Sequence, residues 1–166
     1  YHAKKAVTDS LDTIKNYSYK IALPAPSLYG QFGPNYSRER IVLALKQFGF
    51  DYVFEVARAA EIVTNASENY MKSKNIKKPV ISSACPAVVR FIQIRFPNLI
   101  DNLLKIESPM EVAAALSKQE VHEKFGIPIE KMGVFFISPC AAKVTSIKAP
   151  YENIKSNVDV VLSIKD

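Results

Sequence analysis

The sequence predicts an α/β fold in which a mainly parallel sheet is flanked by helices. Short apolar runs, typical of strands, alternate along the chain with segments whose apolar residues recur at helical spacing. The run over residues 133–138 is apolar almost without interruption, as expected of a strand covered on both faces. Because the chain has 166 residues and no internal repeat, residues 1–166 are predicted to form a single α/β lobe.

Five segments have the composition and length of strands: residues 19–23, 51–56, 79–83, 133–138 and 158–164. Helices are predicted over residues 3–16 and 37–49. Three more are predicted: one from the end of the second strand to about residue 72, one from Pro86 to Pro97, and one that begins after Ser108. Ser108 and Glu111 have the spacing of a capping box, in which each side chain accepts from the other residue's main-chain N–H. The expected buried helix positions include Ile41, Leu45, Phe48, Val88, Val89, Phe91, Ile92, Val112, Ala115 and Leu116.

Composition excludes several classes of protein. The chain is 48% hydrophobic and 23% charged, which is globular and not disordered, and no apolar run is long enough to cross a bilayer. The net charge is +6, but the one dense basic run, residues 72–78, lacks aromatic residues for base stacking and is interpreted as a solvated loop. We therefore expect neither a nucleic-acid nor a membrane partner. The first residues carry no initiator Met and no apolar signal core, so we expect a cytoplasmic piece of a longer polypeptide.

The two cysteines lie at positions where a parallel sheet is expected to bind a ligand. Ligands of open parallel sheets bind beyond the carboxyl ends of the strands, and Cys85 and Cys140 each follow a predicted strand. Pro86 and Pro139 stiffen the two turns, and the helix that begins at Pro86 favours a thiolate at Cys85. Two such sulfurs suit a soft metal or an iron–sulfur cluster. Spacing alone also allows two buried, inert thiols.

Four motifs, in order along the chain, resemble the [FeFe] hydrogenases. Residues 82–86, SSACP, resemble the first signature of that family, T-S-C-C-P, and residues 136–143, FISPCAAK, are similar to the second, M-P-C-x-x-K. Residues 25–27, APS, resemble the turn after the first strand of the domain, and residues 45–54 are close to the lead into the second strand. The resemblance covers nearly the whole chain and implies the first lobe of an iron-only hydrogenase-like domain.

The resemblance implies a role for five residues. Cys85 and Cys140 match thiolate ligands of the [4Fe–4S] half of the H-cluster. Lys143 matches a lysine that donates a hydrogen bond to a cyanide ligand of the two-iron half, and Pro26 and Ser27 match a turn that offers a second donor. Fixed donors of this kind tune the potential of a cluster.

The sequence also departs from the family's pattern. Catalytic members carry a proton-relaying cysteine where this chain has Ala84, and a methyl group cannot relay a proton. Val88 replaces a tryptophan, Ser138 replaces the methionine of the second signature, and acidic residues of the proton path are replaced around residues 66–67. The third signature, with two further cluster cysteines, is absent. We therefore expect the second lobe to be missing from residues 1–166, and any cluster in this chain alone to be absent or incomplete.

These features predict a hydrogen-sensing or redox-sensing protein, or a hydrogenase of low activity, for the reaction H2 = 2 H+ + 2 e−. The resemblance implies an anaerobe's cytoplasmic iron–sulfur protein with a ferredoxin-like electron carrier or domain and signalling domains in the same polypeptide. One alternative is a scaffold or interaction lobe without a cluster. Another is a cysteine-dependent phosphatase using Cys85 and Arg90, but the intervening loop is one residue short, lacks glycine and loses an amide at Pro86.

Other titratable residues carry weaker signals. The two histidines, His2 and His122, are interpreted as surface residues. Glu55 and Glu61 are interpreted as solvated or helix-capping carboxylates.

Overall fold

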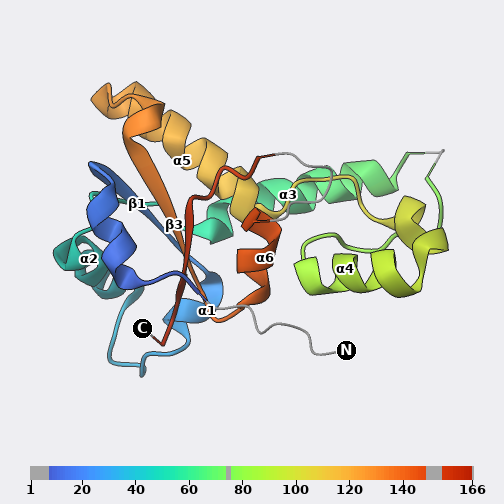
Figure 1. Cartoon of the computed structure of the whole chain (residues 1–166), viewed down its shortest axis with the longest axis horizontal. Coiled ribbons are helices and arrows are strands. Elements are labelled where there is room, and N and C mark those ends of the chain that lie inside the picture. The colour runs from blue at the N-terminus through green and yellow to red at the C-terminus, as the bar shows by residue number, and fades with distance from the viewer. Residues whose placement is uncertain (1–7, 74–75, 149–154, 166) are drawn as a thin grey trace.

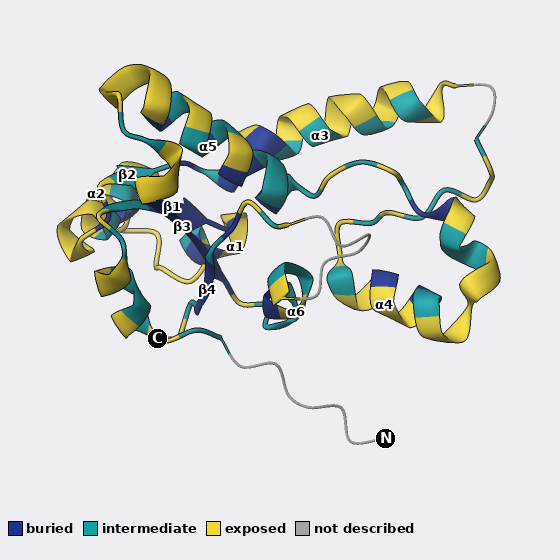
Figure 2. Cartoon of the chain, turned by 45° about the horizontal axis from the view of Figure 1, so that its top comes forward, coloured by how far each residue is buried: buried dark blue, intermediate teal, exposed yellow. Residues whose placement is uncertain are grey.

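A four-stranded, entirely parallel sheet forms the centre of the protein. The computed structural model describes residues 8–73, 76–148 and 155–165. The strands lie in the order β2-β1-β3-β4. Figure 1 labels the two central strands, β1 and β3, and Figure 2 labels all four. They are β1 (Tyr19–Pro24), β2 (Tyr52–Val53), β3 (Met132–Ser138) and β4 (Val160–Ser163). The predicted α/β fold with a mainly parallel sheet is thus confirmed.

Helices connect and cover these strands. The α-helices are α1 (Pro26–Tyr29), α2 (Arg38–Phe48), α3 (Val56–Met71), α4 (Pro86–Arg95), α5 (Pro109–Phe125) and α6 (Ala142–Lys148). Three 3-10 helices complete the set: η1 (Leu11–Asn16), η2 (Pro97–Asn102) and η3 (Ile129–Lys131). The predicted helix over residues 3–16 is therefore a shorter 3-10 helix, and residues 3–7 of that prediction lie outside the described residues.

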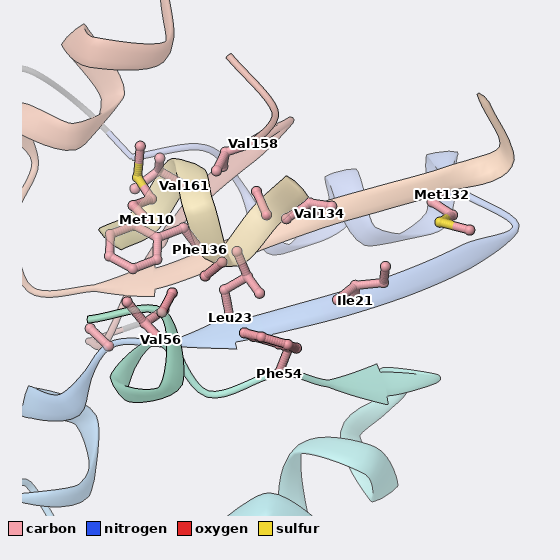
Figure 3. Close-up of a cluster of buried hydrophobic side chains, with 14 of the residues drawn as sticks. Ile21, Leu23, Phe54, Val56, Met110, Met132, Val134, Phe136, Val158 and Val161 are labelled. Atoms are coloured by element: carbon pink, nitrogen blue, oxygen red, sulfur yellow. The ribbon is translucent and has the colours of Figure 1, made fainter. Parts of the chain in front are cut away.

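The two faces of the sheet bury separate apolar clusters. Ile21 and Val134 point to one face and join a cluster with side chains of α3, α5 and α6 (Figure 3). Phe135 points to the other face, where Tyr17 and Phe50 contact its ring edge to face, with centroids 5.3 and 5.5 Å away. Every residue of β3 is buried. The uninterrupted apolar run of this strand is explained by its central position between two covered faces.

A smaller unit lies beside the sheet, and it corrects the prediction of a third strand over residues 79–83. Ile81 pairs with Leu103 in an isolated bridge, in which its main-chain N donates to Asn102 and its oxygen accepts from Leu104, both at 2.8 Å. The side chain of Ile81 packs on a small cluster formed by α4 and η2. The segment is apolar because it serves this second cluster, so the described part of the sheet has four strands and not five.

Helix ends follow the predicted signals in most cases. Ser37 caps α2 by accepting from the N–H of Arg40, and Gly49, with φ of 122°, ends it. Ser108 caps α5, but the reciprocal half of the predicted capping box is wrong. The Glu111 carboxylate instead accepts from the hydroxyl of Ser156 and the N–H of Asn157, so it fastens the segment that leads into β4.

Several predicted helix faces are only partly buried. Phe48 and Phe91 are 58% and 56% exposed, and Ala115 is exposed, whereas Ile41, Val89 and Ile92 are buried as expected. Figure 2 shows that α4 and the C-terminal part of α3 are largely exposed. The wrong positions lie one residue from the buried face or at a helix end.

Among the described residues, no helix combines the length and apolarity required to cross a bilayer.

Candidate metal centre

The carboxyl ends of β1 and β3 bring two of the predicted site segments together. These strands are direct neighbours, and Pro24 lies opposite Ile137 in their register. The main-chain N–H of Ala25 donates to the Ile137 oxygen at 3.0 Å, which continues the pairing past the end of β1. The turn that carries Pro26 and Ser27 therefore begins beside the turn that carries Cys140.

The turn after β3 fixes Cys140. The hydroxyl of the buried Ser138 accepts a hydrogen bond from the Cys140 N–H at 3.2 Å. The Cys140 oxygen in turn accepts from the N–H of Lys143 at 3.1 Å, which leads into α6. Cys140 is half-buried with a free thiol. Ser138, which departs from the methionine of the family signature, thus has a structural role as a cap for this turn.

Cys85 reaches the site from outside the sheet. It is the N-cap residue of α4, where its oxygen accepts from the Val89 N–H at 3.1 Å, and its thiol is free and exposed. The hydroxyl of Ser83 holds the preceding segment by donating to the Ile106 oxygen at 3.2 Å. The expectation that Cys85 follows a strand of the sheet is wrong, because residues 79–83 belong to the unit of α4 and η2. Its predicted place at a helix N-terminus is confirmed.

Lys143 joins the two cysteine segments. Its Nζ donates a hydrogen bond to the Ala84 oxygen at 2.9 Å, and helices α4 and α6 pack against each other. Burial lowers the pKa of Lys143, while negative charge on Cys140, Cys85 and Glu111 acts in the opposite direction. Ala84 immediately precedes Cys85, and the main-chain N–H of Lys143 binds the Cys140 oxygen, so the two cysteine segments meet at this lysine. The structure therefore brings Cys85, Cys140 and Lys143 into one neighbourhood.

Pro26 and Ser27 occupy the first two positions of the four-residue helix α1 and are exposed. The Leu28 N–H donates to the Ala25 oxygen at 2.9 Å, and the Gln31 side chain donates to the Ser27 oxygen at 3.1 Å. Their place at the end of β1 agrees with the predicted turn. Their role toward a ligand stays a prediction.

The donor set fits half of a four-thiolate cluster site. The chain has two cysteines, and the described residues contain no group of three or more His, Cys, Asp or Glu side chains that could hold a metal ion. A cavity of about 340 Å³ has a lining that includes Ser83 and Pro86, on either side of Cys85, together with Glu111 and Ser146, but neither cysteine lines it. Two thiols beside one ammonium suit an anionic iron–sulfur group better than a lone divalent ion, which would require further ligands.

Two other sequence candidates lie on the surface. His122 is exposed, and its Nδ1 lies 2.9 Å from the Ile127 oxygen. Arg90 is exposed on α4, and its guanidinium contacts Gln93 at 3.4 Å. The exposed position of His122 agrees with its interpretation as a surface residue.

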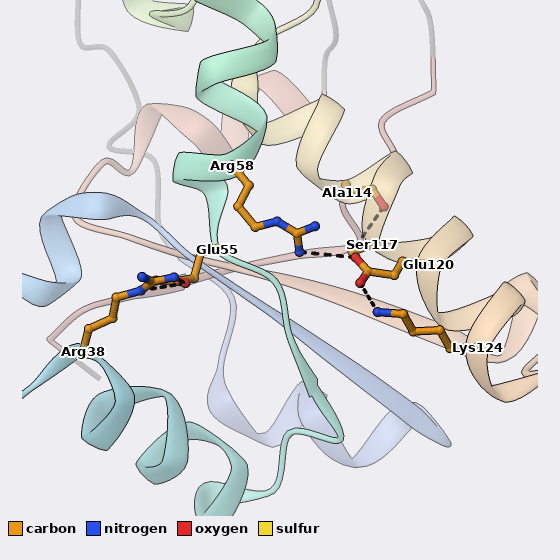
Figure 4. Close-up of polar contacts among 7 residues, drawn as sticks. All are labelled: Arg38, Glu55, Arg58, Ala114, Ser117, Glu120 and Lys124. Atoms are coloured by element: carbon orange, nitrogen blue, oxygen red, sulfur yellow. Dashed lines mark hydrogen bonds and ion pairs between the residues drawn. The ribbon is translucent and has the colours of Figure 1, made fainter.

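Sequence reasoning missed the role of Glu55. Its side chain is only 13% exposed and makes no capping bond, although it is the N-cap residue of α3. Arg38 Nε donates to both of its carboxylate oxygens, at 2.7 and 2.8 Å (Figure 4). The interpretation of Glu55 as a solvated or capping carboxylate is wrong. The partners are 17 residues apart, and no local sequence signal pairs them.

A second ion-pair cluster begins one turn further along α3. Arg58 contacts Glu120 of α5 at 3.3 Å, and Lys124 also binds that carboxylate (Figure 4). The Arg58 guanidinium lies 4.4 Å from the ring centroid of Phe54, in a cation–π contact. This cluster ties α3 to α5 and does not reach the cysteine segments.

Comparison with known proteins places this geometry in context. Residues 18–166 match the family described as "Iron only hydrogenase large subunit, C-terminal domain". The chain is 29% identical over 138 residues to a subunit of the NADP-reducing hydrogenase of Solidesulfovibrio fructosivorans, which covers 76% of this chain and 24% of that protein. It is 30% identical over 104 residues to the cytosolic Fe–S cluster assembly factor of Aspergillus terreus, which covers 57% of this chain and 17% of that protein.

The fold is also that of solved [FeFe]-hydrogenases. The apo form of the enzyme from Chlamydomonas reinhardtii superposes with a TM-score of 0.67 at 19% identity, covering 96% of this chain and 43% of the other. The chain spans about a quarter or less of the length of the two curated relatives.

Proposed function

Because the chain belongs to the family formed by the C-terminal domains of iron-only hydrogenase large subunits, we propose that it supplies two thiolate ligands, Cys85 and Cys140, to an iron–sulfur centre of the H-cluster type. The hydrogen bond from Lys143 to Ala84 carries this proposal, because it holds the two cysteine segments against each other. Two thiolates are half of what a [4Fe–4S] cluster requires, so the remaining ligands come from outside this chain.

Lys143, Pro26 and Ser27 are the residues that would face the two-iron part of such a centre. When bound, that group supplies the site at which H2 is split or formed. A lysine ammonium is a compact donor suited to a small anionic ligand such as cyanide. Its partial burial strengthens any hydrogen bond that it makes to an anion, because the local dielectric constant is low. The α1 turn would present a second donor from the end of β1.

Ala84 favours sensing or slow turnover over rapid catalysis. In H2 = 2 H+ + 2 e−, the electrons pass to a carrier and the protons must leave through side chains or water. The methyl group of Ala84 neither accepts nor donates a proton, so proton delivery at this position has no side chain to use. We propose that a ferredoxin-like carrier or domain takes the electrons, and that signalling domains in the same polypeptide respond to the state of the centre.

A second candidate is a non-catalytic role in which a cluster is carried but no hydrogen reacts. The similarity to a cytosolic Fe–S cluster assembly factor favours it. Ala84 agrees with this candidate as well, so the two proposals must be separated by activity and not by iron content.

Iron content of the full-length polypeptide, assembled without oxygen, tests the ligands. We expect Cys85→Ser and Cys140→Ser each to lose most of the bound iron and sulfide. Ala87→Ser and Ala141→Ser are matched controls, because each adds a hydroxyl close to one cysteine and keeps the thiol. Full iron in either cysteine variant, or an equal loss in the controls, would contradict the proposed ligands.

Ala84→Cys separates the two candidates. A sensing or low-activity hydrogenase should gain about 100-fold or more in H2 turnover, since a positioned proton donor contributes that much in other enzymes. A cluster carrier without the two-iron group should gain nothing. Rapid turnover of the unaltered protein would show that Ala84 does not limit proton delivery.

A further inference from the structure

The hydroxyl of Ser138 lies at the end of β3, directly before the turn that carries Cys140. Ser138 is the one polar residue of this strand, and it is only 3% exposed. Its Oγ accepts a hydrogen bond from the Cys140 N–H at 3.2 Å. A serine hydroxyl that accepts such a bond still has its own proton to donate.

No residue in the described part of the chain accepts the Ser138 proton. There, the bond from Cys140 is the one hydrogen bond that the Ser138 side chain makes. Ser117, another buried serine, donates its proton to the Ala114 oxygen at 2.9 Å. A buried donor without an acceptor destabilises a fold, so the Ser138 proton requires an acceptor that the described polypeptide does not supply.

Ser138 faces the side of the sheet on which the two cysteine segments meet. Side chains alternate along a strand, so Ser138 shares a face with Phe136, which packs in the cluster that includes side chains of α6. Helix α6 carries Lys143, whose bond to the Ala84 oxygen joins the Cys85 segment to this helix. A group bound between the cysteine segments would thus lie on the same side of the sheet as the Ser138 hydroxyl.

The sulfur atoms of an iron–sulfur centre are acceptors that suit this place. Thiolate and sulfide carry negative charge, and hydrogen bonds to them help to set the reduction potential of a cluster. Ser138 replaces the methionine of the family signature, and a methionine thioether has no proton to donate. The serine therefore adds a donor that the signature residue lacks.

We propose that Ser138 acts on the centre in two ways. Its Oγ holds the Cys140 turn, and its hydroxyl proton is donated to a sulfur atom of the bound iron–sulfur centre. The donated hydrogen bond raises the reduction potential, because it favours the more negatively charged, reduced state. The donation rests on the proposed function, whereas the bond to the Cys140 N–H does not.

Redox titration of the full-length polypeptide, assembled without oxygen, tests the donation. We expect Ser138→Ala to keep its iron and sulfide, but to shift the reduction equilibrium about tenfold toward the oxidised state, which is about 59 mV for a one-electron couple. Ser138→Thr keeps the hydroxyl and should keep the potential of the unaltered protein. A potential in Ser138→Thr as low as that of Ser138→Ala would contradict the role of the hydroxyl.

Ser163→Ala is the matched control. Ser163 lies opposite Ser138 in the register of β3 and β4, and its Oγ accepts from the Lys165 N–H at 3.0 Å. It thus makes the same kind of turn at the end of the neighbouring strand, with a lysine in place of the cysteine, and its loss should leave the potential unchanged. The proposed donation is wrong if Ser138→Ala has an unaltered potential, or if Ser163→Ala lowers the potential equally.

Hydrogen–deuterium exchange of the iron-free, full-length polypeptide tests the turn without the centre. We expect Ser138→Ala to accelerate exchange over residues 140–143 about three- to tenfold, because the Cys140 N–H loses its acceptor, and Ser138→Thr to leave it unchanged. Equal exchange in Ser138→Ala and the unaltered protein would overturn the hold on the turn. If the unaltered polypeptide binds no iron, the proposed function fails and the donation with it, while exchange that depends on Ser138 would still support the hold.

Discussion

Lys143 Nζ and the main-chain oxygen of Ala84 form a hydrogen bond of 2.9 Å across 59 residues of sequence. Ala84 immediately precedes Cys85, and Lys143 is three residues beyond Cys140. The bond therefore joins the unit of α4 and η2 to the helix that follows the central strand β3. The bond thus lies between the segments that carry the two predicted cluster ligands, Cys85 and Cys140.

Removal of this bond should loosen the Cys85 segment. Lys143→Met keeps the apolar length of the side chain and removes its donor, so we expect amide exchange over residues 82–90 to accelerate about three- to tenfold. Lys148→Met is the matched control, because Lys148 lies on the same helix and pairs with Asp9 instead. Unchanged exchange in Lys143→Met would mean that packing alone holds the segment.

Gly133 accommodates the ring of Tyr17. A Cβ at residue 133 would lie 2.3 Å from Tyr17 Cγ, an atom near the main chain that cannot move aside easily. Gly133→Ala should therefore displace Tyr17 from Phe135 and lower the free energy of unfolding by about 1–3 kcal/mol. Gly33→Ala, with no atom within 4 Å of the new Cβ, should change it by less than about 0.5 kcal/mol. Denaturant unfolding measures both, and equal effects would contradict the close approach.

The Arg38–Glu55 contact should make stability depend on acid. Hydrogen bonding from Arg38 holds the pKa of Glu55 below its ordinary value of 4.5, although partial burial opposes this. The stabilisation is therefore fully present above about pH 4.5 and is lost as the pH falls through the lower folded-state pKa.

Denaturant unfolding of the unaltered protein and of Glu55→Gln measures this dependence. The difference in unfolding free energy should be constant near neutral pH and shrink in acid. A difference that grows as the pH falls would contradict the assignment.

Much of the fold could be predicted because its signals are local. The apolar run of β3, the serine cap at Ser37 and the glycine stop at Gly49 each follow from a few adjacent residues. The parallel arrangement follows from strands that alternate with helices.

Local sequence could not show that the third predicted strand, residues 79–83, lies outside the sheet. A short apolar run such as residues 79–83 has the same composition whether it joins a sheet or packs on a neighbouring helix, and only Leu103, more than twenty residues later, decides. The local sequence around Glu111 fits a capping box. In the structure its carboxylate instead accepts hydrogen bonds from Ser156 and Asn157, which lie 45 and 46 residues later in the chain.

The candidate site was predicted from motif order and not from geometry. The sequence singled out Cys85, Cys140 and Lys143, and the structure brings them into one neighbourhood. It did not indicate that Lys143 binds the Ala84 oxygen, or that Arg38 binds the Glu55 carboxylate. Both are long-range contacts of flexible charged side chains, which leave no periodic pattern in the sequence.

Crosslinking of the two thiols tests the central claim most directly. In the 166-residue chain, Cys85 and Cys140 are the only thiols, and a bifunctional bromobimane becomes strongly fluorescent once both of its arms have reacted. We predict one reagent per chain and a single internal crosslink between Cys85 and Cys140, identified by mass spectrometry and abolished in Cys140→Ser. Two separately labelled thiols, with no crosslinked peptide, would contradict a shared metal centre.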